Sequence, residues 1–236
     1  MRLWNRKVLI IIIAGFIIAA TGGGFYIKKL IDDAYNYKKY TDKGYDYLLR
    51  GKEGLAYKEF NKAGEIRPDS YDVHFGLGTV YLKQRKLGPA ADELELALQI
   101  NPEAEDAHYS LGVTYQRMEN YPLALREYKE VLKKNPKSVQ VHNNIGGIYM
   151  EQGNYDEAVK SFRAAIDINP EYFTAYFNIG KVYEKQRKTA SAIAEYKKII
   201  EITSHIPGSE GYAAIAKKRI NKLTNGYTSQ KTGHKK

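Results

Sequence analysis

The chain of 236 residues contains no cysteine. Disulfide bonds, thiol nucleophiles and thiolate metal ligands are therefore excluded. The sequence also lacks a glycine-rich phosphate loop, a zinc motif of the HExxH type and a serine nucleophile elbow. We therefore expect neither an enzyme nor a cofactor, and no metal ion.

Acidic residues are outnumbered, with 27 Asp and Glu against 37 Lys and Arg, which gives a formal charge of +10. Such an excess can indicate affinity for nucleic acid or anionic lipid. Here acids and bases alternate through most of the chain, and part of the excess lies at its two ends, in residues 2–7 and 231–236. We interpret these ends as solvated tails and expect no nucleic-acid binding.

One long apolar run is present near the start. Residues 8–27 contain no charged side chain over 20 positions, and about 20 apolar residues at 1.5 Å rise cover the ~30 Å hydrocarbon core of a bilayer. Basic residues flank the run on both sides, at Lys7 and Lys28 among others. The sequence predicts one transmembrane anchor over 8–27, preceded by a short basic N-terminus (1–7) and followed by a helical linker (28–36).

A cleaved signal peptide is the alternative for this run, with Ala20-Thr21-Gly22 as the cleavage site. The length of the apolar run and the apolar residues after it favour an uncleaved signal-anchor. Because basic residues lie on both sides, the positive-inside rule does not decide the orientation. A short basic N-terminus before a first apolar segment usually stays in the cytoplasm, so we expect a single-pass membrane protein whose remaining residues lie outside the cytoplasm.

The rest of the chain has a 34-residue period. Glycine, tyrosine and alanine each recur at this spacing over five copies, as Gly44, Gly78, Gly112, Gly146 and Gly180; Tyr47, Tyr81, Tyr115, Tyr149 and Tyr183; and Ala56, Ala90, Ala124, Ala158 and Ala192. Prolines close the first four copies, at Pro68, Pro102, Pro136 and Pro170. A fixed period of this length indicates a solenoid, which more often forms a binding surface than a catalytic site.

Each copy contains two blocks of apolar residues at helical spacing, separated by short polar turns, which predicts a helix–turn–helix unit. The residue before a proline is pushed out of helical dihedrals, so the Asn-Pro pairs are strong stops. The predicted units within 37–204 are 37–70, 71–104, 105–138, 139–172 and 173–204. A capping helix is expected at 207–223, and a basic disordered tail at 224–236.

These residues resemble the tetratricopeptide repeat (TPR) family. The order His74-x2-Leu77-Gly78-x2-Tyr81, then Ala90-x3-Leu94, then Pro102, matches its pattern. The resemblance implies an all-α fold, a right-handed α-solenoid of five TPR units with a C-terminal capping helix, preceded here by the transmembrane helix. Small residues are expected where the two helices of a unit cross, and Tyr128, Phe162 and Tyr196 are expected to pack toward the neighbouring unit.

Three histidines, His74, His108 and His142, also recur at 34 residues. Equivalent points in successive units are separated by about a helix packing distance, ~8–10 Å, whereas zinc needs nitrogen ligands at ~2.0–2.1 Å. The three rings cannot share an ion, so we interpret them as partly buried packing residues.

In the family the first helix of each unit lines a concave groove. Helical periodicity places four aromatic residues and three asparagines among the exposed groove positions, which are Tyr45, Phe75, Thr79, Tyr109, Ser110, Asn143, Asn144, Phe177, Asn178 and Lys181. Asparagine amides can bind the backbone of an extended peptide, and aromatic rings add contact area. We expect a protein partner held as an extended segment, most of all at Asn144 and Asn178; the alternative is that these residues only pack helix against helix.

The sequence thus predicts a membrane-anchored TPR adaptor or scaffold that acts in protein secretion, folding or assembly of an envelope complex. Family members that bind chaperone tails use a lysine, asparagine and arginine clamp; the positions of Phe75, Thr79, Tyr109 and Val113 do not supply that set. Two alternatives stay open: a self-assembling, homo-oligomeric scaffold on the membrane, and an adaptor that faces the cytoplasm and recruits partners there.

Overall fold

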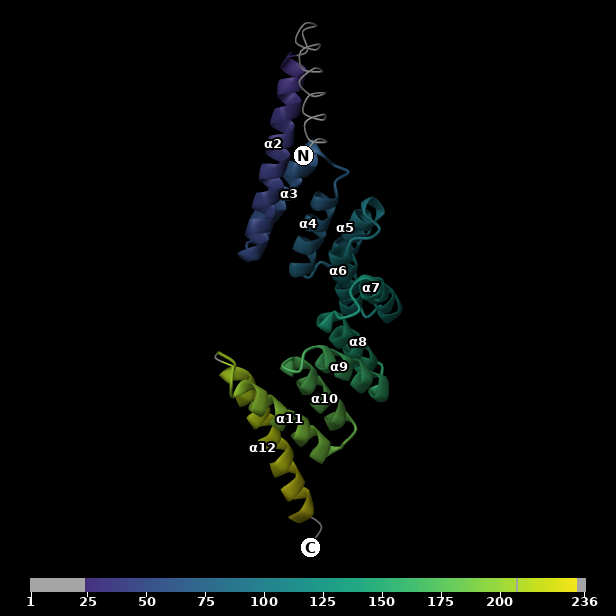
Figure 1. Ribbon diagram of the computed structural model, residues 1–236, viewed down its shortest axis with the longest axis vertical. Helices are drawn as coiled ribbons and strands as arrows, with labels where there is room; N and C mark the ends of the chain where they lie inside the picture. Colours follow the sequence, from purple (N-terminus) through teal and green to yellow (C-terminus); the bar gives the residue numbers. More distant parts are fainter. Residues whose placement is uncertain (1–23, 207, 233–236) are drawn as a thin grey trace, which may run out of the picture. The chain divides into compact units, whose positions relative to one another are not determined.

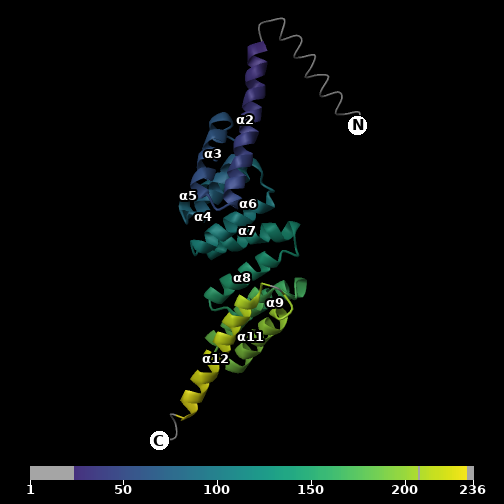
Figure 2. The same cartoon turned by 90° about the vertical axis from the view of Figure 1, so that its left-hand side faces the viewer.

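The computed structural model describes residues 24–206 and 208–232, and over these ranges the chain forms eleven α-helices and no strand. The predicted all-α helical repeat is confirmed. The chain divides into two compact units, Met1–Thr114 and Tyr115–Lys236, with the boundary inside helix α6 (Glu105–Arg117). Each unit is described by itself below (Figures 1 and 2).

The first unit is built from pairs of helices. Before α6 its helices are α2 (Gly24–Leu49), α3 (Glu53–Ile66), α4 (Tyr71–Lys83) and α5 (Leu87–Ile100). Helix α2 packs on α3, α4 packs on α5, and α3 contacts α4. The core of this unit includes the fully buried side chains of Ala56, Phe60 and Val80.

The second unit repeats the arrangement and ends in one additional helix. Its helices are α7 (Tyr121–Lys134), α8 (Val139–Glu151), α9 (Tyr155–Ile168), α10 (Phe173–Lys185), α11 (Thr189–Thr203) and α12 (Glu210–Thr232). Helix α8 packs on α9 and α10 on α11, while α9 contacts α10 and α11 contacts α12. The buried core includes Phe162, Ile179 and Tyr196.

The repeated glycine lies where the two helices of one repeat cross. A Cβ atom added to Gly44 would lie 2.7 Å from the ring of Phe60, and one added to Gly180 would lie 2.5 Å from the ring of Tyr196. The large residue 16 positions later therefore fills the space that the missing side chain leaves. Phe162 occupies the same place against Gly146.

This packing adds to the sequence prediction, in which Tyr128, Phe162 and Tyr196 pack toward the neighbouring repeat. The rings of Phe162 and Tyr196 also contact the glycine of their own repeat, and Phe60 lies against both Gly44 of its own repeat and Gly76 of the next. Tyr128 does contact the next repeat, through its hydroxyl and Asn144. Glycine has no side chain, so the two helices of one repeat come close enough for the ring to lie against the glycine backbone.

The turn between the two helices of each repeat has a left-handed residue at the same position. Its φ is positive in all five repeats, at Gly51 (66°), Arg85 (60°), Glu119 (59°), Gly153 (79°) and Arg187 (59°). The next amide bonds back to the carbonyl of the repeated tyrosine, as in Lys86 N to Tyr81 O at 2.9 Å and Asn154 N to Tyr149 O at 2.9 Å. This 6→1 bond and the left-handed residue form a Schellman motif, which ends the first helix.

The two ends of the described chain differ in detail from the prediction. Helix α2 is continuous from Gly24 to Leu49, so the predicted linker 28–36 and the first repeat helix are one helix. The segment from 224 was predicted to be disordered, but α12 continues to Thr232. No proline interrupts this stretch, and extending an existing helix avoids the cost of nucleating one.

The predicted transmembrane segment 8–27 lies outside the described residues except for its last four. Among the helices of the described ranges, none combines the length and the apolar composition that crossing a bilayer requires.

Candidate functional site

One face of α10 carries three of the predicted groove residues, Phe177, Asn178 and Lys181, together with Thr174, which was not predicted. Thr174, Phe177, Asn178 and Lys181 are spaced by three, four and seven positions, so they lie on the same side of the helix. All four are partly exposed. The opposite side of α10 carries Ile179 among the buried residues of the core. The local sequence therefore turns a mixed polar and aromatic face outward.

Two of the predicted asparagines are brought together across neighbouring repeats. Nδ2 of Asn178 on α10 donates a 3.0 Å hydrogen bond to Oδ1 of Asn143 on α8. The bond uses one donor of Asn178 and one acceptor of Asn143. Within the described part of the chain, the Asn143 Nδ2 group and the Asn178 Oδ1 atom have no other partner. The pair thus leaves the NH2 group of Asn143 and the carbonyl oxygen of Asn178 unused, which are a donor group and an acceptor of the kind that a peptide backbone can bond.

Asn144 has a different environment from its neighbour. Its Nδ2 donates to the hydroxyl of Tyr128 at 3.1 Å, and that hydroxyl donates to Oε1 of Gln116 at 2.8 Å. Tyr128 is fully buried. The amide of Asn144 therefore satisfies a buried polar group, a role that sequence periodicity did not indicate.

In the first unit, three of the predicted groove residues also have partners within the repeats. The hydroxyl of Tyr45 donates to the carbonyl of Asp72 at 3.3 Å, and its ring lies edge-on to Phe60 with centroids 5.1 Å apart. Burial, and secondly the nearby carboxylate of Asp72, raises the pKa of Tyr45. Phe75 stacks on Tyr71 at 5.5 Å and accepts a 2.8 Å bond from Thr79 Oγ1 through its carbonyl.

The two predicted residues on α6 are both partly buried. The carbonyl of Ser110 accepts a 2.8 Å hydrogen bond from Oγ1 of Thr114, one turn later. Tyr109 is the residue before Ser110 and also makes contacts of its own. Both lie in the first unit, and the Asn143–Asn178 pair lies in the second.

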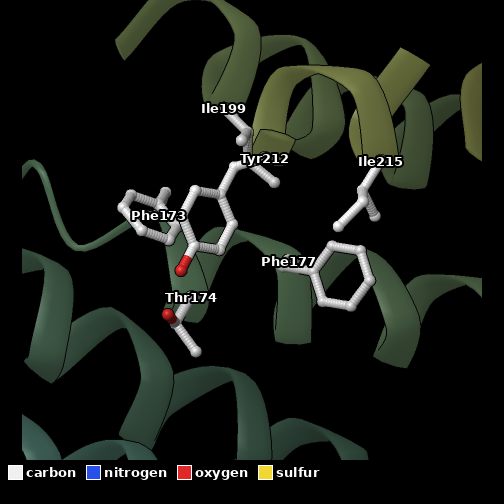
Figure 3. Close-up of a pocket in the computed structure, with 6 residues that line it drawn as sticks. All are labelled: Phe173, Thr174, Phe177, Ile199, Tyr212 and Ile215. Atoms are coloured by element: carbon white, nitrogen blue, oxygen red, sulfur yellow. The ribbon is translucent and has the colours of Figure 1, made fainter. Parts of the chain in front are cut away.

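An apolar pocket lies beside Phe177, between α10, α11 and α12 (Figure 3). Its volume is about 150 Å³, and its lining residues are Phe173, Thr174, Phe177, Ile199, Tyr212 and Ile215. The rings of Phe173 and Tyr212 are 4.0 Å apart at their centroids, and Ile215 lies opposite Phe177 (Figure 3). Tyr212 and Ile215 are each 49% exposed, so the pocket opens to solvent along α12.

Among these lining residues, only Phe177 is one of the predicted groove residues. The sequence contains a pattern that could have indicated the pocket: Phe173 and Phe177 are one turn apart on α10, and Tyr212 and Ile215 are one turn apart on α12. Whether large apolar residues on two facing helices leave a pocket between them depends on how the helices pack, and the sequence does not encode that packing in a recognisable motif.

The basic residues near the exposed face of α10 differ in whether they form ion pairs. Lys185 lies 3.9 Å from a carboxylate oxygen of Glu151, and Arg219 lies 3.4 Å from one of Glu184. Lys181, one turn before Lys185, forms no ion pair with any residue that the structure describes. The exposed face of α10 therefore carries an uncompensated positive charge.

The three periodic histidines have separate surroundings. Nδ1 of His74 lies 2.7 Å from Oε2 of Glu93. Nε2 of His108 donates to the carbonyl of Pro102, and Nε2 of His142 to that of Pro136, each at 2.9 Å. These bonds fasten the loop that joins successive repeats. Across residues 24–206 and 208–232, no group of three His, Asp or Glu side chains is placed to hold a metal ion.

Comparison with known proteins agrees with this architecture. Family models described as "Tetratricopeptide repeat" match residues 105–138, 127–160 and 173–205, and one described as "TPR repeat" matches 146–186. No curated protein sequence matches the chain.

Solved structures similar to the chain include MamA and YrrB. A MamA crystal structure is 21% identical with a TM-score of 0.63, covering 72% of this chain and 93% of that one. MamA 41-end from Desulfovibrio magneticus RS-1 is 17% identical with a TM-score of 0.67, covering 73% and 98%. YrrB, described as a TPR protein with an unusual peptide-binding site, is 24% identical with a TM-score of 0.61, covering 81% and 97%. These likenesses concern the fold, and with the matches to the family models they lead to one conclusion: the chain carries tetratricopeptide repeats.

Proposed function

We propose that this protein is a membrane-anchored TPR adaptor that holds an extended segment of a partner protein against α8 and α10. The observation that carries the proposal is the Asn143–Asn178 pair, two partly exposed side chains with an unused donor group and an unused acceptor. An extended segment offers one N–H and one C=O per residue, so two side-chain amides can bind it whatever its side chains are. The described peptide-binding site of YrrB, a protein of the same fold, supports this class of function.

The apolar run at 8–27 supports the membrane part of the proposal. An anchor confines the repeats to one side of the membrane and raises their effective concentration toward partners there, so weak contacts in the groove suffice. With the N-terminus in the cytoplasm, the repeats act outside it, in secretion, folding or assembly of an envelope complex.

Site-specific photo-cross-linking in cells tests the adaptor function. A photoreactive residue replaces Gln140, which is exposed and one turn before Asn143 on α8. The matched control replaces Lys160 on α9, whose side chain is 79% exposed. We expect discrete protein adducts from position 140 and none from position 160. Equal adducts from both positions would contradict a binding face on α8 and α10.

Topology is tested with the Lys137→Cys variant, since the chain has no native cysteine and Lys137 is exposed. An impermeant thiol reagent should label this residue in intact cells. Labelling only after the membrane is opened would instead place the repeats in the cytoplasm, and cytoplasmic recruitment would replace the secretory role. Recovery of the chain in the soluble fraction without residues 8–27 would show a cleaved signal peptide.

Self-assembly is a second candidate, favoured by the first turns of α2. Beyond the proposed anchor, Leu30, Ile31 and Tyr35 are each more than half exposed there, and a second copy would cover this apolar surface. Sedimentation velocity of the detergent-solubilised chain should then show sizes that grow with concentration, and an Ile31→Glu variant should remove them. A single size at all concentrations would exclude this candidate.

A further inference from the structure

We infer that the partner segment is acidic and carries an aromatic anchor: its ring enters the pocket between α10 and α12, and a carboxylate about two residues away binds Lys181. The inference rests on the proposed function and names the chemistry of the partner. Three features carry it, namely the size and lining of the pocket, the unpaired charge of Lys181, and the spacing between them.

The pocket fits one aromatic side chain. Its volume is about 150 Å³, and an apolar protein cavity of about that size holds a benzene molecule. No charged residue lines it, and Thr174 and the hydroxyl of Tyr212 are its polar groups. An ionised or strongly polar side chain would lose its hydration there without compensation. A phenyl ring instead gains contact with Phe177 and the half-exposed Ile215.

Lys181 supplies the complementary charge. It makes no ion pair within the described part of the chain, whereas the nearby Lys185 and Arg219 have Glu151 and Glu184 as partners. A carboxylate from the partner would therefore meet a lysine that need not first give up an internal ion pair. Charge-assisted hydrogen bonds to such a lysine are stronger than neutral ones.

The spacing of the two features sets the spacing of the ligand. Phe177 and Lys181 are one helical turn apart, and such neighbours have Cβ atoms about 5–6 Å apart. An extended chain advances about 3.3 Å per residue. The carboxylate of the partner is therefore two positions along the chain from its aromatic ring, and the backbone between them passes Asn178.

The charge of the chain's own ends argues for a separate partner. Residues 2–7 and 231–236 carry lysine and arginine and no acidic residue. Like charges would oppose the binding of either end beside Lys181. An acidic segment of another protein can place its aromatic ring in the pocket and its carboxylate at Lys181.

Synthetic peptides test the inference directly. The probe is a fluorescein-labelled, amidated six-residue peptide with phenylalanine and, two residues later, glutamate, all other positions being glycine or serine. Fluorescence anisotropy is measured with the full-length chain in detergent micelles. We expect replacement of the phenylalanine by alanine to weaken binding about tenfold or more, and replacement of the glutamate by glutamine to weaken it about twofold to fivefold at low salt.

Variants of the protein locate the binding. Ile215→Asp places a charge at the mouth of the pocket, and Leu96→Asp on α5, a similarly exposed apolar residue, is its control. Lys181→Glu reverses the charge, with the exposed Lys197 as the matched control in Lys197→Glu. We expect only Ile215→Asp and Lys181→Glu to weaken the probe. A peptide with lysine in place of glutamate should bind Lys181→Glu better than it binds the unchanged protein.

The inference is overturned if the phenylalanine and alanine peptides bind equally, or if Ile215→Asp binds the probe as tightly as Leu96→Asp does. It is also overturned if Ile215→Asp abolishes self-association in sedimentation, because the occupant is then a second copy. These outcomes differ from a failure of the adaptor function, which is measured independently by cross-linking from position 140. If position 140 forms adducts but the phenylalanine and alanine peptides bind equally, the adaptor function stands and the acidic, aromatic ligand is rejected.

Discussion

Nδ2 of Asn178 donates a 3.0 Å hydrogen bond to Oδ1 of Asn143, 35 residues earlier in the chain. The same offset joins side chains on other neighbouring helices, in the pairs Tyr37–Asp72, Tyr71–Asp106 and Glu184–Arg219. Those three pairs each join a donor to a carboxylate. The asparagine pair is neutral and leaves the Nδ2 group of Asn143 and the Oδ1 atom of Asn178 without another partner in the described part of the chain, and the proposed binding face rests on this difference.

Asn143 and Asn144 are adjacent but should respond differently to removal of the amide. Asn143→Ala combined with Asn178→Ala should abolish adducts from position 140 and change the free energy of unfolding by less than about 0.5 kcal/mol, because both groups are partly exposed. Asn144→Ala should lower that free energy by about 1–2 kcal/mol, because the buried hydroxyl of Tyr128 loses a donor.

Urea unfolding followed by circular dichroism measures both effects. The control is Asn61→Ala on α3, where the amide bonds the carbonyl of Tyr57 at an exposed site. Equal loss of stability in Asn144→Ala and Asn61→Ala would show that the Tyr128 contact contributes little to the fold.

The close approach of helices at the repeated glycine predicts a strong packing effect. Gly180→Ala would place a methyl group 2.5 Å from the ring of Tyr196, which is fully buried and cannot move aside freely. We expect a loss of about 1–3 kcal/mol in the free energy of unfolding. Gly54→Ala is the matched control, since nothing lies within 4 Å of its added methyl group; it should stabilise α3 by about 0.5–1 kcal/mol. A stable Gly180→Ala protein would mean that the two helices separate easily.

The sequence allowed the fold to be predicted because its strongest constraints are periodic. The spacing between Gly180 and Tyr196 recurs in every copy of the pattern, so the same crossing of helices is expected at each repeat. The candidate site was harder to predict, because helical spacing does not distinguish Asn143, which bonds Asn178, from Asn144, which bonds the buried hydroxyl of Tyr128. That distinction depends on the position of the Tyr128 hydroxyl, which lies in the previous repeat and contacts Asn144.

The pocket shows a second limit of periodicity. Tyr212 and Ile215 lie on α12, which has no counterpart among the repeats, and its placement over α10 and α11 follows from packing rather than from a motif. The helix also continues past the predicted end at 223 to Thr232. The polar composition of residues 224–236 indicated a disordered tail. Composition alone does not show that an existing helix can continue into such a segment.

The left-handed turn position predicts stabilising substitutions. Arg85 has φ of 60°, and Gly153 holds the equivalent place with φ of 79°. A residue with a Cβ costs roughly 1–2 kcal/mol in this conformation, whereas glycine does not. Arg85→Gly should therefore raise the free energy of unfolding, by about 1 kcal/mol after the larger entropy of the unfolded glycine is counted. Gly153→Ala should lower it, and thermal melting of both variants measures the opposite signs. Two changes of the same sign would show that this turn relaxes to another conformation.

Tyrosine ionisation predicts a loss of stability at high pH. A hydrogen bond with Tyr57, and then burial, raises the pKa of Tyr81 to about 12, and burial followed by a bond to Asp106 raises that of Tyr71. The folded state holds these protons more tightly than the unfolded chain, in which tyrosine has a pKa of about 10. Stability is therefore unaffected below about pH 10 and falls as the pH rises toward 12.

Urea midpoints measured at pH 8, 10 and 11 test this expectation. In Tyr81→Phe the fall between pH 10 and 11 should be shallower than in the unchanged protein, because one raised tyrosine no longer ionises. The midpoint at pH 8 serves as the reference. Tyrosine is not ionised at that pH, so the difference between the two proteins reflects only the loss of the hydroxyl. Parallel pH curves for the two proteins would mean that the hydroxyl of Tyr81 ionises at the same pH in the folded and unfolded chain, and that the bond to Tyr57 does not hold its proton.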